Sequence, residues 1–165
     1  MKLYKKIYLE KFTSEDFDQY YQLVSNEQVM AKITERSIPL DEAKEKFKLL
    51  LLNNALHPLF GHLKITEMDT NEFIGLAKLK VKEMGSIEAE LGYMLLPEYW
   101  GKGICTQVAS MLVEKAKSIK QLDKLVAIID PANIPSRKIL IKNGFKSDKL
   151  CEIDGLPGEI LSMKV

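Results

Sequence analysis

Alternating apolar and polar positions in the middle of the chain predict a series of β-strands. The period is two over three successive segments, with turn-forming residues between them. A short continuous apolar run at residues 125–129 is typical of a strand buried on both faces. The segments with strand patterns are 3–12, 59–66, 72–81, 86–95, 125–129, 145–151 and 160–165.

Apolar positions three or four residues apart predict four helices. The first begins at Thr13 or Ser14, the second runs from about residue 37 to 56, the third follows residue 103, and the fourth covers 135–142. The resulting order is strand, two helices, three strands, helix, strand, helix and two strands. This order predicts an α/β (α+β) fold with a mixed sheet, whose parallel part lies near the third helix.

Composition narrows the class of protein. The 165 residues suffice for one domain with a buried core. Lys+Arg 24 against Asp+Glu 23 gives a net charge of +1, which disfavours a nucleic-acid binder. Two cysteines exclude a disulfide scaffold, and neither a membrane span nor a signal peptide is indicated. We therefore expect one cytoplasmic domain over residues 1–165 with no nucleic-acid or membrane partner; a homodimer stays open.

A glycine-containing turn connects the strand at 86–95 to the third helix. Residues 101–103 are Gly-Lys-Gly, and no Ser, Asp or Asn stands where it could cap the first free N–H groups. Such amides suit a pyrophosphate, although a tight turn with water at its amides fits the pattern equally. Ile104 excludes a P-loop, and Thr106 stands where a dinucleotide-binding loop has its third glycine.

Two segments resemble motifs of a known family. Residues 95–106, Leu-Leu-Pro-Glu-Tyr-Trp-Gly-Lys-Gly-Ile-Cys-Thr, resemble the acetyl-CoA-binding motif of the GNAT superfamily of N-acetyltransferases. Residues 130–140 with Asn143-Gly144-Phe145 resemble the second motif of the branch that includes ribosomal-protein N-terminal acetyltransferases. The resemblance implies a GNAT fold of about seven strands and four helices. It also implies acetyl transfer from acetyl-CoA to a primary amine by direct attack in a ternary complex.

The resemblance further implies where acetyl-CoA binds. Its pantetheine arm would pair with the exposed backbone of a splayed strand, and its pyrophosphate would bind the amides of the loop. The asparagine of the second motif would contact the cofactor. Apart from the resemblance, the positive charges of Arg137 and Lys138 are placed to meet the ribose 3′-phosphate. These cofactor-binding assignments are Tyr93, Met94, Leu95, Gly101, Lys102, Gly103, Ile104, Cys105, Thr106, Asn133 and Arg137.

Two residues are candidates for proton transfer. A protonated amine cannot attack a thioester, so a group near the amine must accept a proton. Glu90 lies on the strand before the loop, where this family often uses a glutamate, although it also fits a solvated strand face shared with Glu88. Ser136 lies where this branch places a hydroxyl near the departing thiolate.

Two positions depart from the family pattern. Cys105 occupies a loop position that is usually Gly or Ala, and Leu140 stands where many relatives have a tyrosine general acid. The missing tyrosine keeps an alternative open, a CoA-binding regulatory module without turnover. For an enzyme, the first acceptor is a protein N-terminal amine and the second a small amine, such as an antibiotic, a polyamine or an amino acid. His57 and His62 have no partner at metal-ligand spacing, so no metal is expected.

Overall fold

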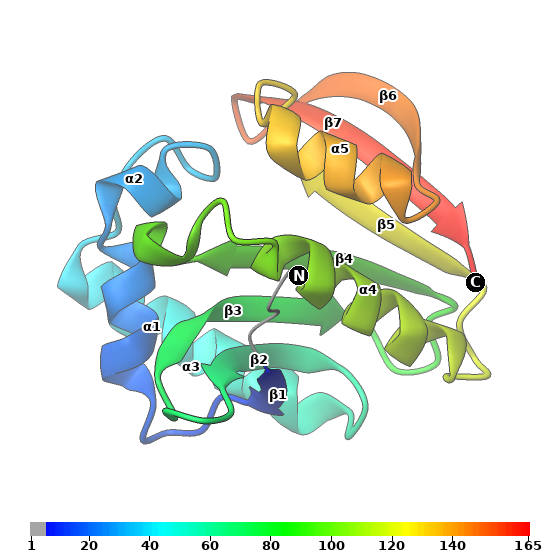
Figure 1. Ribbon diagram of the computed structural model, residues 1–165. Helices are drawn as coiled ribbons and strands as arrows, with labels where there is room; N and C mark the ends of the chain where they lie inside the picture. Colours follow the sequence, from blue (N-terminus) through cyan, green and yellow to red (C-terminus); the bar gives the residue numbers. More distant parts are fainter. Residues whose placement is uncertain (1–5) are drawn as a thin grey trace.

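Seven strands join in the order β1-β2-β3-β4-β5-β7-β6 in the computed structural model, which describes residues 6–165 (Figure 1). Neighbouring strands are antiparallel except for β4 and β5, which confirms the predicted mixed sheet. The strands are β1 Ile7–Lys11, β2 Gly61–Glu67, β3 Phe73–Lys80, β4 Glu88–Leu95, β5 Lys124–Ile129, β6 Lys146–Ile153 and β7 Leu156–Lys164.

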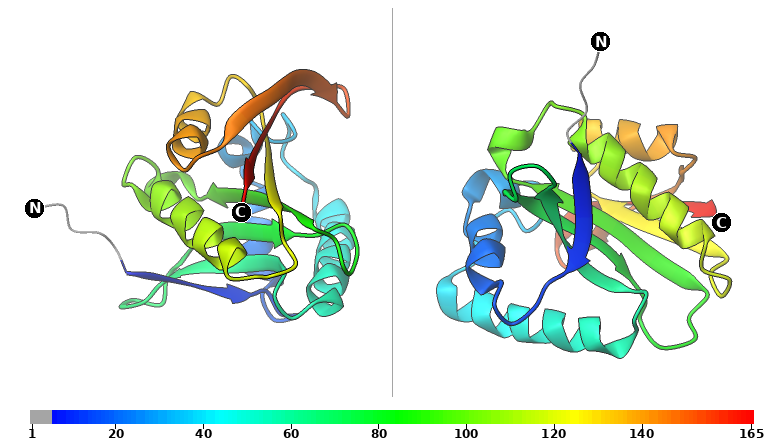
Figure 2. Two further views of the ribbon diagram at one scale, coloured as in Figure 1. Left: turned by 90° about the vertical axis from the view of Figure 1, so that its right-hand side faces the viewer. Right: turned by 60° about the horizontal axis from the view of Figure 1, so that its bottom comes forward.

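Helices cover both faces of the sheet (Figure 2). Helices α4 and α5 pack on one face, and α3 with α1 packs on the other. The described helices are α1 Phe17–Val24, α2 Glu27–Met30, α3 Leu40–Leu56, the 3-10 turn η1 Pro97–Tyr99, α4 Ile104–Lys117 and α5 Ile134–Lys142. No helix of the described residues is long and apolar enough to cross a membrane.

Apolar side chains pack on both faces of the sheet. Beneath α4, Leu91, Leu112 and Leu125 are at most 2% exposed, as expected for apolar stripes that turn toward a shared interior. On the other face, the ring of Tyr20 stacks on Phe47 with centroids 5.1 Å apart. Strands β3 and β4 therefore lie between apolar side chains packed on both faces of the sheet.

Strands β4 and β5 separate soon after they meet. Only residues 88–90 of β4 pair with residues 124–126 of β5, although β4 continues to Leu95 and β5 to Ile129. Beyond the paired residues, the two strands diverge and leave backbone groups of β4 without a neighbouring strand. This is the splay that the family resemblance implied.

Helix α1 begins later than predicted. It starts at Phe17, because residues 13–16 form a turn in which the Asp16 N–H donates to the Thr13 carbonyl at 3.0 Å. The Asp16 carboxylate accepts from the Thr13 N–H at 2.7 Å and from Lys64 Nζ at 3.0 Å. These contacts stabilise the turn and prevent a helix from starting at Thr13 or Ser14.

The short helix α2 was not predicted, so the prediction of four helices was one too few for the described residues. The side chain of Asn26 accepts from the N–H groups of Gln28 and Val29 at 2.9 and 3.2 Å and begins this helix. Four residues are too few to show an apolar period. The remaining predicted elements are confirmed with shifted ends, and residues 3–5 of the first strand lie outside the described residues.

The prediction that β5 is buried on both faces is wrong. Leu125 and Ala127 are buried, but Ile128 is 44% exposed. Beyond residue 126, β5 has left β4, so Ile128 borders a cavity instead of a packed layer. Its apolar side chain is therefore available to a ligand.

Candidate active site

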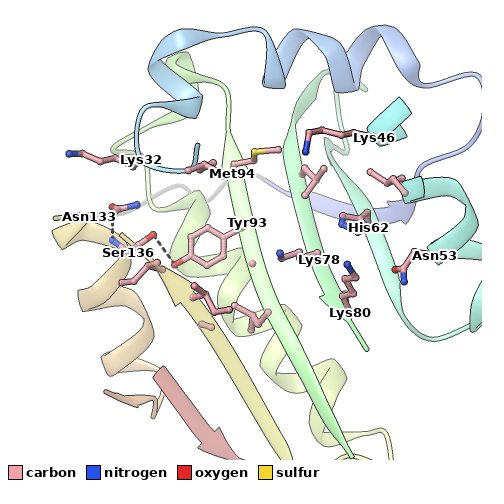
Figure 3. A pocket seen from close by; sticks show the side chains of 18 of the residues that line it. Lys32, Lys46, Asn53, His62, Lys78, Lys80, Tyr93, Met94, Asn133 and Ser136 are labelled. Carbon is pink, nitrogen blue, oxygen red and sulfur yellow. Dashed lines mark hydrogen bonds between the residues drawn. The ribbon is translucent and has the colours of Figure 1, made fainter. Parts of the chain in front are cut away.

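A cavity of about 370 Å³ lies over the diverging ends of β4 and β5. On one side most of its lining comes from β4, β5 and the start of α5, and on the other from β2, β3 and α3. Tyr20 of α1 and Lys32 and Ile33, which follow α2, also line it. Figure 3 shows Tyr93, Asn133 and Ser136 on the first side, and Lys46, His62 and further lysines on the second. Gly92 also lines the cavity, between the two sides.

The turn before α4 presents open backbone amides. Gly101 and Gly103 have φ values of +71° and +80°, a region that glycine adopts without steric cost. A Cβ at either position would have nothing within 4 Å, so both face open space. Within residues 6–165, no N–H of residues 101–106 donates a hydrogen bond. These amides at the positive end of a 14-residue helix can bind a pyrophosphate.

The end of β4 presents backbone groups to the cavity side. The Leu96 N–H donates to the Ile74 carbonyl of β3 at 3.0 Å. Because successive residues of a strand direct their backbone polar groups to opposite sides, those of Tyr93 and Leu95 face the splay. The Leu95 carbonyl accepts from the indole Nε1 of Trp100 at 2.9 Å. The Leu95 N–H and both groups of Tyr93 therefore have no strand beside them.

Two hydroxyl groups meet on the β4–β5 side of the cavity (Figure 3). Asn133 caps α5 by accepting from the Ser136 N–H at 3.3 Å, and Ser136 Oγ donates to Tyr93 Oη at 3.4 Å. Burial raises the pKa of Tyr93 to about 12, so its phenol keeps its proton at neutral pH. Sequence reasoning used only the backbone of Tyr93, because no local pattern indicates a contact across 43 residues.

Neither departure from the family pattern supplies a catalytic group. Leu140 is buried and lines the cavity, so an apolar side chain occupies this wall. Burial raises the pKa of the Cys105 thiol to about 11. The thiol is therefore protonated at neutral pH and is no nucleophile there.

Arg137 is held by a buried carboxylate. Its Nε donates to both oxygens of Glu159, at 3.1 and 3.2 Å, and Glu159 is 2% exposed. Within residues 6–165 the terminal guanidinium nitrogens make no hydrogen bond. Contact between Arg137 and the ribose 3′-phosphate stays a prediction that this geometry permits.

Glu90 forms an ion pair at the edge of the cavity. Its Oε1 lies 3.2 Å from Lys78 Nζ, with the two side chains 31% and 29% exposed. Lys78 lines the cavity, whereas Glu90 does not. The proton-accepting role of Glu90 stays a prediction, in which a water or Lys78 connects it to the amine.

The side of the cavity formed by β2 and β3 was missed by sequence reasoning. His62 pairs with Lys78 in the strand register, and Lys78 pairs with Gly92, so all three lie on one face of the sheet. Burial, Lys78 and Lys80 lower the pKa of His62 to about 4, so the imidazole is neutral at pH 7. The signal was the set of polar residues that alternate with apolar ones along residues 59–66 and 72–81, to which the sequence analysis assigned no role. Within residues 6–165, no group of three His, Cys, Asp or Glu could hold a metal ion.

Comparisons with known proteins agree with this geometry. A family model described as an acetyltransferase (GNAT) domain matches residues 6–146. The uncharacterized N-acetyltransferase p20 of Bacillus licheniformis is 25% identical over 147 residues, covering 88% of this chain and 82% of that protein. The uncharacterized N-acetyltransferase YoaA of Bacillus subtilis (strain 168) is 31% identical over 84 residues. That match covers 51% of this chain and 48% of YoaA, about half of each protein.

A solved structure has the same fold. The spermidine N-acetyltransferase from Vibrio cholerae, in complex with CoA and spermine, superposes with a TM-score of 0.80 at 18% identity. The superposition covers 96% of this chain and 95% of that chain. At this identity the likeness concerns the fold, and acceptor choice must be argued from this chain's own residues.

Proposed function

Because the chain belongs to the GNAT family of acetyltransferases, we propose that it transfers an acetyl group from acetyl-CoA to a primary amine. The observation that carries this proposal is the cavity at the splay of β4 and β5. The cavity reaches the end of β4, from which the turn with open amides leads into α4. One extended molecule can therefore place a pyrophosphate on the amides and a thioester in the cavity.

Several contacts would hold the cofactor. The amides of Gly101, Lys102, Gly103, Ile104, Cys105 and Thr106 bind the pyrophosphate, and the free backbone groups of Tyr93 and Leu95 bind the pantetheine arm. Met94 and Asn133 line the same cavity. The terminal nitrogens of Arg137 bind the 3′-phosphate, oriented by the ion pair to Glu159.

The proposed chemistry is direct attack. Acetyl-CoA supplies the thioester carbonyl, to which the neutral amine nitrogen forms a bond while the carbon–sulfur bond breaks. Glu90 accepts the proton that the amine loses, through a water or Lys78, and Ser136 donates to the departing sulfur. When the Ser136 hydroxyl turns to donate to the sulfur, the direction of its 3.4 Å hydrogen bond with Tyr93 reverses, and the protonated Tyr93 hydroxyl donates to Ser136 Oγ. It thereby replaces the general acid that Leu140 cannot provide.

Acetyl-CoA binding is the first test. We expect acetyl-CoA to raise the melting temperature, because a ligand that binds only the folded state stabilises it. Dephospho-CoA should raise it less if Arg137 contacts the 3′-phosphate, and Arg137→Met should remove that difference. Release of free thiol with an amine then measures transfer. A melting temperature unchanged by millimolar acetyl-CoA would contradict the proposal.

Leu140 favours a second candidate function, a CoA-binding regulatory module without turnover. This candidate predicts stabilisation by acetyl-CoA but no thiol release with any amine. The branch of the family and the class of acceptor, a protein N-terminal amine or a small amine, also belong to the proposal. The charges in the cavity bear on that choice.

A further inference from the structure

We propose that the acceptor is an amine that also carries an anionic group, a carboxylate, phosphonate or phosphate, and that lysines on the β2–β3 side of the cavity bind this group. The proposal rests on the proposed function, because it names the acceptor of the same site. Lys46 of α3 and Lys78 and Lys80 of β3 line that side (Figure 3). None of the described residues that line the cavity is acidic.

The two lysines of β3 form the floor of this side. Lys78 and Lys80 alternate along the strand, so both project from the same face. Lys78 lies against Gly92, where a Cβ would be 2.7 Å from its Cε, and the glycine therefore leaves room for the lysine beside β4. Both side chains are half-buried, which weakens the screening of their charges by water.

Nearby carboxylates neutralise only part of this charge. Glu90 pairs with Lys78 at 3.2 Å. Glu42 lies near Lys46, but both of its oxygens accept from Arg36, at 2.7 and 2.8 Å. The side chain of Lys80 makes no ion pair or hydrogen bond within residues 6–165, because the carboxylate of its register partner, Glu90, pairs with Lys78 instead. Positive charges held together in a half-buried space favour the binding of an anion.

His62 provides an independent indication of a ligand on this side. Its Nδ1 is buried without a hydrogen-bond partner in the described part of the chain. Buried polar atoms are seldom left without a partner. Because His62 lines the cavity, a small rotation of the imidazole would bring this nitrogen to a bound molecule. The imidazole is neutral at pH 7 and can hydrogen-bond to a ligand without adding further positive charge.

The same charges disfavour a polycationic acceptor. The second ammonium group of a diamine would lie among Lys46, Lys78 and Lys80, where like charges repel. The lysines also favour the neutral form of the reacting amine, because they disfavour an ammonium ion nearby. An amine with an anionic group at its other end avoids the repulsion at that end, and its reacting nitrogen is still kept neutral by the lysines. The fold shared with a spermidine acetyltransferase therefore does not extend to a shared acceptor charge.

A matched series of acceptors tests the proposal. β-Alanine, 2-aminoethylphosphonate, propylamine and 1,3-diaminopropane have similar length and differ in the charge at the far end. We expect kcat/KM from thiol release to be at least tenfold higher for an anionic acceptor than for propylamine, and lowest for the diamine. Comparison of kcat/KM for β-alanine and 2-aminoethylphosphonate shows whether the site prefers a carboxylate or a phosphonate. Preference for the diamine or for propylamine would overturn the inference while leaving the proposed function intact.

Lysine variants test whether Lys80 is responsible for the preference for an anionic acceptor. Lys80→Met should lower kcat/KM for the preferred anionic acceptor about tenfold and lower it much less for propylamine, which has no anionic group for the lysine to bind. Lys80→Glu should increase the relative activity with the diamine. Lys120→Met, an exposed lysine outside the cavity, is the matched control and should change neither value. Equal effects of Lys80→Met on charged and neutral acceptors would overturn the inference.

A binding experiment separates the inference from turnover. Calorimetric titration of β-alanine, 2-aminoethylphosphonate and the diamine into CoA-saturated protein requires no acetyl transfer. If an anionic amine binds and Lys80→Met weakens that binding, the inference is supported even when no thiol is released. The absence of thiol release would contradict only the proposed function. Binding of neither anionic amine, or binding that Lys80→Met leaves unchanged, would overturn the inference.

Discussion

Lys78 occupies the space that a side chain on Gly92 would take. The two residues are direct partners in the register of β3 and β4, and a Cβ on Gly92 would lie 2.7 Å from Lys78 Cε and 3.2 Å from its Cγ. The glycine therefore makes room for a neighbouring side chain, and its own backbone conformation does not call for a glycine. It also places a lysine between the cofactor side of the cavity and the side proposed for the acceptor.

Replacing this glycine should displace the lysine. We expect Gly92→Ala to raise KM for an anionic acceptor about tenfold, because Lys78 must move away from its present position. Acetyl-CoA affinity should stay nearly constant, since the amides of residues 101–106 are unaltered. In a Lys78→Met background, the same substitution should have little further effect. An undiminished effect in that background would show that Lys78 is not responsible.

The turn before α4 offers a substitution with a matched control. Gly103→Asp places a negative charge where the pyrophosphate is proposed to bind, and Gly103→Asn imposes the same backbone strain at φ +80° without the charge. We expect Asp to weaken CoA binding more than tenfold relative to Asn, or about 1.4 kcal/mol. Calorimetry measures both affinities. Equal affinities for the two variants would show that no anion approaches this turn.

The role of Glu90 can be separated from its ion pair with Lys78. If Glu90 accepts the amine proton, Glu90→Gln should lower kcat about a hundred- to ten-thousandfold at neutral pH. The defect should shrink at high pH, where more of the amine is already neutral. If Glu90 only neutralises Lys78, the variant should keep its kcat and bind an anionic acceptor more tightly. In that case Glu88 or bulk water becomes the better candidate for the base.

The two hydroxyls beside the proposed thiolate position should act together. We expect Ser136→Ala to lower kcat at every pH, with a smaller effect for a thioester whose thiol leaves more readily. Tyr93→Phe should have a weaker effect, which disappears once Ser136 is alanine, because the Ser136–Tyr93 hydrogen bond is then absent. Additive losses in the double variant would contradict a joint role.

His62 should make stability depend on pH. The unfolded chain takes up a proton at this imidazole near pH 6.5, whereas the folded protein does so near pH 4. Between these values the unfolded state binds more protons, so stability falls as the pH is lowered through this window. The contribution of His62 should decrease by about 2 kcal/mol between about pH 7.5 and about pH 5.

Urea unfolding of the wild type and His62→Gln at both pH values isolates this contribution. The free energy of unfolding should fall more for the wild type than for the variant, because the variant lacks the titrating group. Carboxylates such as Asp16 titrate in both proteins and cancel in the comparison. Parallel changes in the two proteins would show that His62 titrates normally in the fold.

Local patterns predicted most elements because each depends on residues close in the chain. The strand alternation and the stop of α5 at Asn143-Gly144 could be read directly, and Gly144 has a φ of +107° in the structure. Helix α2 was missed because four residues show no period, and the start of α1 was misplaced because Lys64 holds Asp16 from 48 positions away.

The candidate site also has a part that local sequence patterns predict and a part that they do not. Its proposed cofactor loop is one continuous motif, so the sequence indicated it as a unit. The acceptor side is assembled from β2, β3 and α3, whose lysines come together only through the strand register. Tyr93 illustrates both cases. Its backbone belongs to the predicted splayed strand, whereas its phenol reaches Ser136 through a contact that no local pattern encodes.

Trp100 gives the protein a natural optical reporter. It is the only tryptophan in the chain, its indole donates to the Leu95 carbonyl, and it is 48% exposed just before the turn at residues 101–103. Tryptophan emission from this protein therefore arises at a single point, the mouth of the splay. A change in the intensity or wavelength of that emission reports on this point alone, without any attached dye.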